Sequence, residues 1–105
     1  MADQRACLLA YIALNDATLQ GVYDSLIVEL RRVAGAPRGT ADPPSVTRLR
    51  IEQRAWISVR DRECTRDPAP GSTPYWAQPL SQCFADMSAA RAVELREALQ
   101  RVRRQ

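Results

Sequence analysis

The fold is decided by residues 8–33, LLAYIALNDATLQGVYDSLIVELRRV, in which apolar side chains recur every three or four residues. This spacing places them on one face of an α-helix, and the alanines between them favour the same structure. Arg31, Arg32 and the following Gly35 are typical of a helix end. We therefore predict a helix over residues 3–33, in which Gly21 marks the close approach of a neighbouring helix.

A second helix is predicted over residues 43–64. Asp42 can cap its first turn, and Pro43 suits its first position because a proline there gives up no helical hydrogen bond. The side chains expected on its buried face follow helical spacing and are Val46, Leu49, Gln53, Trp56, Arg60 and Cys64. This face is less apolar than that of the first helix, so the prediction depends partly on the residues at the start of the helix.

A third helix is predicted over residues 82–104, after a proline-rich loop over residues 65–81 that is long for so small a domain. The side chains expected on its inward face are Cys83, Met87, Arg91, Leu95, Leu99 and Val102. Three amphipathic helices with two connections predict an all-α, up-down-up bundle. A length of 105 residues indicates a single domain.

The three cysteines converge in this topology. Cys7 begins the first helix, Cys64 ends the second and Cys83 begins the third, so all three lie at one end of the bundle. A Cys64–Cys83 disulfide is the first choice because it closes the long loop, a constraint that stabilises by roughly 3 kcal/mol in the chain-entropy picture. A bridge from Cys7 to either of the others is the alternative.

Arg91 is a charged residue on an otherwise apolar face. A buried guanidinium needs a carboxylate partner, because an unpaired buried charge is very costly. Asp16 lies nine residues after Cys7 and Arg91 eight residues after Cys83, so both stand roughly 12–14 Å from the cysteine end. We therefore expect an Asp16–Arg91 ion pair, with Asp61 as the second candidate and extension of Arg91 into solvent as the alternative.

Composition excludes several classes of function. The absence of histidine removes histidine-based triads and the HExxH zinc motif. A formal net charge of +3 permits loose contact with anionic surfaces but is no nucleic-acid footprint. No apolar run is long enough to span a bilayer, and the first residues lack the pattern of a signal peptide. Either the protein is cytosolic, or a leader preceded Met1 and was removed.

Catalysis has weak support in the sequence. Asp61 with Glu63 or Asp67 can be drawn as a carboxylate pair for hydrolysis, but a solvated helix end of mixed charge explains the same residues. The sequence has no glycine-rich phosphate loop and no CxxC spacing, and a cysteine nucleophile would lack a histidine base. We predict a protein that is not an enzyme and that uses neither cofactor nor metal.

The sequence nevertheless resembles one family, the LprI-like lysozyme inhibitors, which are small, exported or lipid-anchored bacterial helical domains. The most specific stretch is Gln53-x-x-Trp56-x-x-x-Arg60-Asp61-x-x-Cys64. The resemblance continues in the first and third helices through Asp16, Leu19, Tyr23, Arg91 and Leu95. The family usually has Asn and Thr where Gln20 and Ser88 stand, and the earliest of its four cysteines has no counterpart here.

The resemblance implies a periplasmic or extracellular protein-binding module that inhibits lysozyme-type peptidoglycan hydrolases, and it allows a lipid anchor on a removed leader. Such enzymes use two carboxylates in a cleft, which arginine donors and an aromatic loop can fill. Candidate contacts are Arg66, Tyr75 and Trp76, although the two aromatic rings can instead fold back over the core. The alternative function is a structural or envelope-stress accessory domain that binds an envelope protein or cell-wall material without inhibition.

Overall fold

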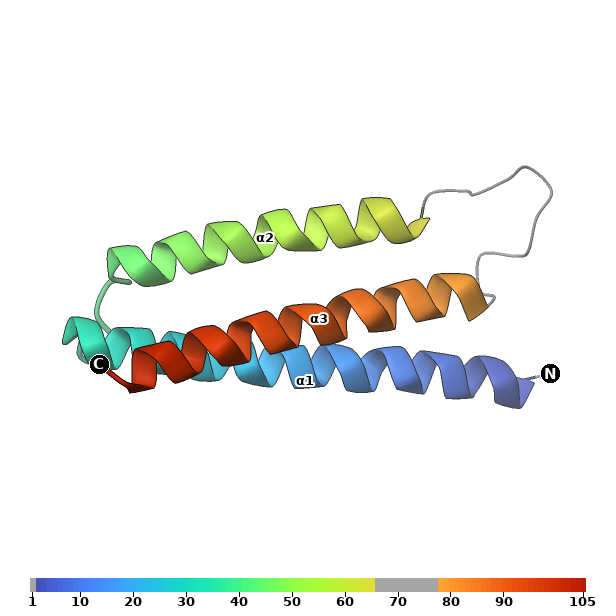
Figure 1. Ribbon diagram of the computed structural model, residues 1–105, viewed down its shortest axis with the longest axis horizontal. Coiled ribbons are helices and arrows are strands. Elements are labelled where there is room, and N and C mark those ends of the chain that lie inside the picture. The colour runs from blue at the N-terminus through green and yellow to red at the C-terminus, as the bar shows by residue number, and fades with distance from the viewer. Residues whose placement is uncertain (1, 66–77) are drawn as a thin grey trace.

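A computed structural model describes residues 2–65 and 78–105, which form three α-helices and no β-strand (Figure 1). The helices are α1 (Ala2–Ala34), α2 (Pro44–Thr65) and α3 (Gln78–Arg103). α1 and α3 run in the same direction and α2 runs against them, so the chain is the predicted all-α, up-down-up bundle. None of these helices has the length and apolar character needed to cross a membrane.

The helix ends differ from the predicted ones mainly at the start of α3. This helix begins at Gln78, not at residue 82, and therefore takes in Pro79. The prediction assigned that proline to the loop, but a proline in the first turn costs no hydrogen bond and its fixed φ suits the helix. The predicted loop over residues 65–81 is shorter accordingly, because Thr65 also belongs to α2.

The end of α1 has the predicted cap. Gly35 adopts a positive φ of 67°, a conformation that glycine reaches without steric cost. Its amide donates to the carbonyl of Arg32 at 3.1 Å, and the amide of Ala36 donates to the carbonyl of Arg31 at 2.9 Å. These two bonds form a Schellman motif, which satisfies carbonyls that the helix end would otherwise leave unpaired.

The start of α2 does not have the predicted cap. Pro43 precedes the helix, and its carbonyl accepts from the amides of Val46 and Thr47 at 3.0 and 3.1 Å. The Asp42 carboxylate is engaged elsewhere, because it accepts from Arg31 at 3.0 Å and from Arg50 at 2.9 Å. Asp42 therefore links the end of α1 to the second turn of α2, and its hydrogen bond raises the pKa of the Arg50 guanidinium above the ordinary value.

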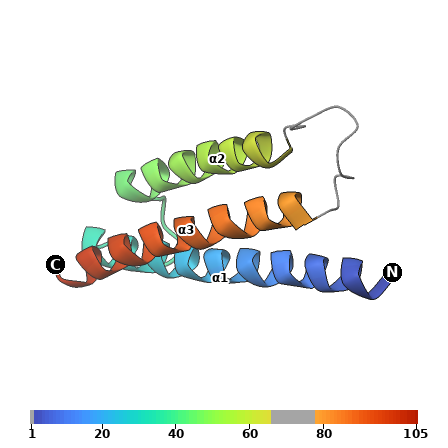
Figure 2. The same ribbon diagram turned by 45° about the vertical axis from the view of Figure 1, so that its right-hand side comes forward.

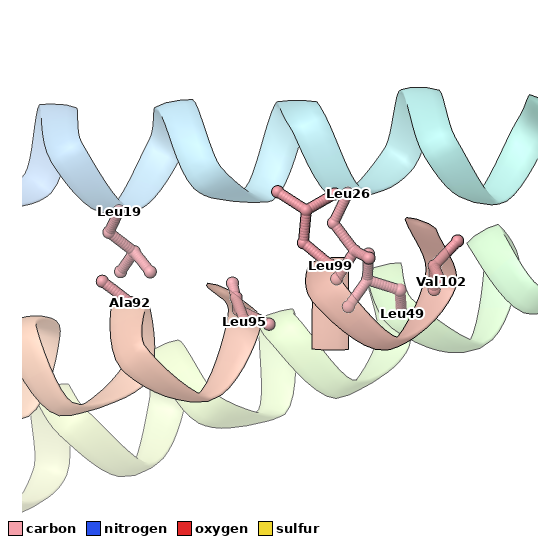
Figure 3. Close-up of a cluster of buried hydrophobic side chains, with 7 residues drawn as sticks. All are labelled: Leu19, Leu26, Leu49, Ala92, Leu95, Leu99 and Val102. Carbon is pink, nitrogen blue, oxygen red and sulfur yellow. The ribbon is translucent and has the colours of Figure 1, made fainter. Parts of the chain in front are cut away.

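The core lies mainly between α1 and α3. These two helices lie side by side in both views, whereas α2 stands farther from them (Figures 1 and 2). Figure 3 shows the buried cluster, to which α2 contributes only one of seven side chains. Its members are Leu19, Leu26, Leu49, Ala92, Leu95, Leu99 and Val102.

The first half of α3 presents small side chains to α1. Ala85, Ser88 and Ala92 are buried there, at three- and four-residue steps, and small side chains allow two helix backbones to approach closely. The predicted inward face of α3 is therefore correct from Leu95 onward but rotated before it. Met87, one of the predicted inward residues, is only half-buried and lies toward α2, with its sulfur 3.6 Å from that of Cys64.

The expectation for Gly21 is wrong. A Cβ atom built on this glycine would meet no other atom within 4 Å. No neighbouring helix therefore comes so close that a side chain at this position would be excluded. Gly21 lies on the exposed side of α1, where it lines a shallow groove together with Ala17 and Ser25 of α1 and Arg96 of α3. This glycine in the interior of α1 is therefore not a packing device but only a site of low helix propensity.

Candidate functional site

One end of the bundle is fixed by a disulfide. Cys64, in the last turn of α2, is bonded to Cys83 of α3 with an S–S distance of 2.06 Å and a Cα–Cα distance of 5.5 Å. This confirms the first of the predicted pairings. Cys7 is a free, exposed thiol. The segment between the two bonded cysteines is thereby closed into a loop that starts and ends on adjacent helices.

Between the disulfide and the buried cluster, the three helices are joined by a set of polar and aromatic side chains that we call the polar layer. It consists of Asp16 of α1, Gln53, Trp56 and Arg60 of α2, and Phe84, Ser88 and Arg91 of α3. All seven are buried or partly exposed, and no buried side-chain nitrogen or oxygen among the described residues lacks a hydrogen-bond partner.

Arg60 occupies the centre of the polar layer. Its guanidinium carbon lies 5.2 Å from the ring centroid of Trp56 and 5.2 Å from that of Phe84, so the cation is in contact with both aromatic rings. It also donates to Asp16 at 3.2 Å and to Asp61 at 3.1 Å. Only 14% of the Arg60 side chain is exposed, which makes both kinds of contact stronger than on an open surface.

Asp16 connects all three helices. It lies on α1 and accepts from Arg60 of α2 and from the hydroxyl of Ser88 of α3, the latter at 3.3 Å. Ser88 is 1% exposed, and its hydroxyl needs such an acceptor. The sequence prediction chose Asp16 as an interhelical partner but did not identify Ser88. The signal that could have found it is its place between Ala85 and Ala92, at helical spacing on the small-residue face of α3.

The predicted Asp16–Arg91 ion pair is wrong in its partner. The Arg91 Nε donates to Gln53 Oε1 at 2.9 Å, and an Nη atom donates to Glu94 at 3.1 Å. Its guanidinium carbon also lies 5.9 Å from the ring centroid of Trp56. Asp61, the second candidate, is likewise bound to Arg60. A buried amide and an exposed carboxylate on its own helix satisfy Arg91, so it needs no carboxylate from α1.

The remaining residues that carry the family resemblance lie in the core, and the candidate partner contacts lie outside the part of the chain that the structure describes. Leu19 and Leu95 belong to the buried cluster, and Tyr23 packs against it. Arg66, Tyr75 and Trp76, the candidate partner contacts, fall within residues 66–77, which lie outside the described part of the chain.

The polar layer has the chemistry of an interhelical lock. Its cations are matched with carboxylates, an amide or aromatic faces. Asp61, part of the carboxylate pair considered from the sequence, is neutralised by Arg60 at 3.1 Å. What the layer does is to set the rotation and height of α2 against the other two helices at the disulfide end.

A family-model comparison matches residues 1–95 to the family described as "Lysozyme inhibitor LprI". The match takes in all of α1 and α2, the disulfide and every residue of the polar layer. No curated protein and no solved structure matches the chain.

Proposed function

Because the chain belongs to the LprI family of lysozyme inhibitors, we propose that it is an exported, non-enzymatic module that binds and inhibits a lysozyme-type peptidoglycan hydrolase. The observation that carries the proposal is the extent of the match, which spans residues 1–95. It therefore includes the Cys64–Cys83 disulfide and all residues of the polar layer. The family is one of inhibitors and not of enzymes, and its members are exported.

The proposed contact surface is the disulfide end. Arg66, Tyr75 and Trp76 belong to the segment between Cys64 and Cys83, whose two attachment points are held 5.5 Å apart at their Cα atoms. Fixing both ends of a binding loop on a rigid scaffold lowers the entropy lost on association. A guanidinium suits the bidentate recognition of a carboxylate, and tyrosine and tryptophan are favoured as interface anchors.

The distribution of charge agrees with a basic partner at this end. The formal net charge of +3 by itself gives no attraction for a basic hydrolase. However, the positive surplus is concentrated at the opposite tip, in residues 27–49 and 101–105. The remaining described residues carry nine acidic side chains and seven arginines, so the larger part of the rod, including the disulfide end, has a slight negative surplus.

The decisive experiment measures inhibition of a panel of lysozyme-type hydrolases by the purified full chain. We expect sub-micromolar inhibition of at least one enzyme, a binding free energy of about −8 kcal/mol or better. Trp76→Ala and Arg66→Gln should weaken it tenfold or more without changing the thermal unfolding midpoint. Arg54→Gln on α2, an equal change of charge at an exposed side chain, serves as the matched control.

Two results would contradict the proposal. One is the absence of binding to every hydrolase in the panel. The other is a pull-down from envelope extract in which a different envelope protein or cell-wall material, and no muramidase, is the main catch. The second result would support the alternative of an accessory domain that binds without inhibiting.

A further inference from the structure

The arginines of this chain are distributed unevenly along the rod. Leu26, Leu49 and Leu99 meet in the core and mark a common level on the three helices. Beyond this level, residues 27–49 and 101–105 form one tip, which we call the basic tip. It carries seven arginines and two acidic residues, a surplus of five positive charges on a chain whose total is +3.

Five of the seven arginines of the basic tip have no ion pair or side-chain hydrogen bond with a described residue. The two acidic residues are taken up by the other two arginines, since Arg31 pairs with Asp42 at 3.0 Å and Arg32 with Glu29 at 2.7 Å. The five that remain come from the first connection, from α2, from α3 and from the residue that follows α3. They are Arg38, Arg48, Arg101, Arg103 and Arg104.

Local stability does not account for this cluster. Cations in the last turn of α3 are favoured by the helix dipole, which explains Arg101 and Arg103. The same dipole does not favour Arg48, which lies in the second turn of α2, near the positive end of a helix whose first turn has no acidic residue. Arg38 is in the connection and gains nothing from either helix. The clustering of all five arginine side chains at one tip therefore indicates a binding partner that carries negative charge.

The family relationship does not account for it either. The family match ends at residue 95, whereas α3 continues to Arg103. Three of these five arginines lie in this last part of the chain. The basic tip also lies at the far end of the rod from the disulfide, and the rod measures 53 Å along its longest axis (Figure 1). Binding at one end thus leaves the other end accessible.

The nature of the surface favours a lipid bilayer over a soluble polyanion. Two large apolar side chains are exposed within the basic tip, Val28 at 64% and Val33 at 42%. Arginines interspersed with exposed apolar side chains are typical of segments that sit at the headgroup boundary, where the charges bind phosphate and the apolar groups enter the acyl region. Guanidinium groups also match the geometry of phosphate oxygens.

We propose that the basic tip docks this protein, end-on and without crossing the bilayer, on a membrane surface rich in anionic phospholipid. The docking is electrostatic, with each guanidinium contributing roughly a fivefold gain in partitioning near an anionic surface. It is therefore weakened by salt, because the screening length falls as ionic strength rises. It is independent of hydrolase inhibition, which is assigned to the other end.

The test is vesicle co-sedimentation of the full chain. Vesicles of phosphatidylglycerol and phosphatidylcholine in equal parts should bind the protein at low salt, and vesicles of phosphatidylcholine alone should not. The triple variant R101Q/R103Q/R104Q should lose roughly 100-fold in partitioning. The control triple variant R54Q/R62Q/R96Q brings the formal charge from +3 to the same zero and should retain most of the binding. Circular dichroism verifies that both variants are folded, and R38Q/R48Q gives a second reading of the tip without altering α3.

Each contrary result overturns the proposal. Equal loss in the two triple variants would mean that binding follows net charge and not the basic tip. Binding to phosphatidylcholine vesicles would remove the electrostatic basis. Binding of soluble polyphosphate with no binding to the anionic vesicles would assign the tip to a soluble polyanion. Inhibition of a hydrolase should be the same for R101Q/R103Q/R104Q and the natural sequence, so failure of this proposal is distinguishable from failure of the inhibitor function.

Discussion

The pair α1–α3 and the single helix α2 are held in the bundle by different forces. α1 and α3 share six of the seven side chains of the buried cluster, whereas α2 contributes only Leu49. α2 also buries Val46 and packs Trp56 against the cluster, and it is held further by the disulfide and polar layer at one end and by Asp42 at the other. Apolar burial is strong but not directional, and polar and covalent contacts are directional. The comparison indicates that the pair supplies most of the stability and that α2 is positioned by specific bonds.

The largest expected effect is in the α1–α3 interface. Leu95 is 3% exposed, so Leu95→Ala removes buried apolar volume and should lower the free energy of unfolding by about 3 kcal/mol. Chemical denaturation measures this change. Val93→Ala, two residues away and 50% exposed, should cost under about 0.5 kcal/mol. Similar losses in the two variants would contradict the assignment of the core to this interface.

The second effect concerns the attachment of α2. The double variant Cys64→Ser/Cys83→Ser should lower the free energy of unfolding by about 3 kcal/mol. The disulfide joins residues 19 positions apart, and without it the unfolded chain gains conformational entropy. Hydrogen exchange should show that the amides of α2 lose protection before those of α1 and α3. Cys7→Ser is the control and should leave stability unchanged, because this thiol is free. Loss of protection in all three helices at once would break the distinction between the pair and α2.

A smaller effect is expected in the polar layer. Arg60→Ala removes contacts with two aromatic rings and an ion pair, and should cost about 2 kcal/mol. Arg60→Lys should recover little, because an ammonium group lacks the planar surface that packs on the rings. Double-mutant cycles should give a coupling of about 0.5 kcal/mol for Asp16 with Arg60 and none for Asp16 with Arg91. The reverse order of coupling would restore the ion pair expected from the sequence.

The smallest effect has the opposite sign. Gly21→Ala places a methyl group in open space within a helix, and should stabilise the protein by about 0.5–1 kcal/mol. Thermal unfolding followed by circular dichroism measures the shift. Because a Cβ atom at Gly21 would meet no atom within 4 Å, its variant sets the scale of a propensity effect against which the other three are compared. Destabilisation would show that the added methyl group clashes with the α3 side chains that line the same groove.

The sequence predicts more about the order and height of the elements than about their rotation. Helical spacing and end residues predict the three helices, and the up-down-up topology predicts that the three cysteines lie at one end. The first choice of Cys64–Cys83, which is confirmed, came from the long loop that this pair closes, while a bridge from Cys7 stayed open as the alternative. Height along the bundle also placed Asp16 correctly. The predicted partner of Asp16 was wrong because Arg60 and Arg91 both lie near its level along the bundle axis. The choice between them depends on the rotation of each helix, which is set by tertiary packing.

The start of α3 and the cap of α2 show a second limit of sequence patterns. Pro79 and Pro43 are each compatible with a loop, a cap position or a first helical turn, so local chemistry does not decide between these states. Asp42 was a good capping residue by type, but two arginines compete for the same carboxylate. The partner contacts proposed at Arg66 and Trp76 depend on the family relationship alone, since no helical period extends through that segment.

The one unbridged thiol gives the molecule a natural attachment point for a probe. Cys7 is exposed and lies near the start of α1. The start of α1 lies at the same end of the bundle as the end of α2 and the start of α3 (Figure 1), which carry the bridged pair Cys64 and Cys83. A maleimide dye will thus label each chain once, with no engineered cysteine. Fluorescence anisotropy and quenching of that dye can then distinguish an enzyme arriving beside the label from a liposome arriving at the remote end.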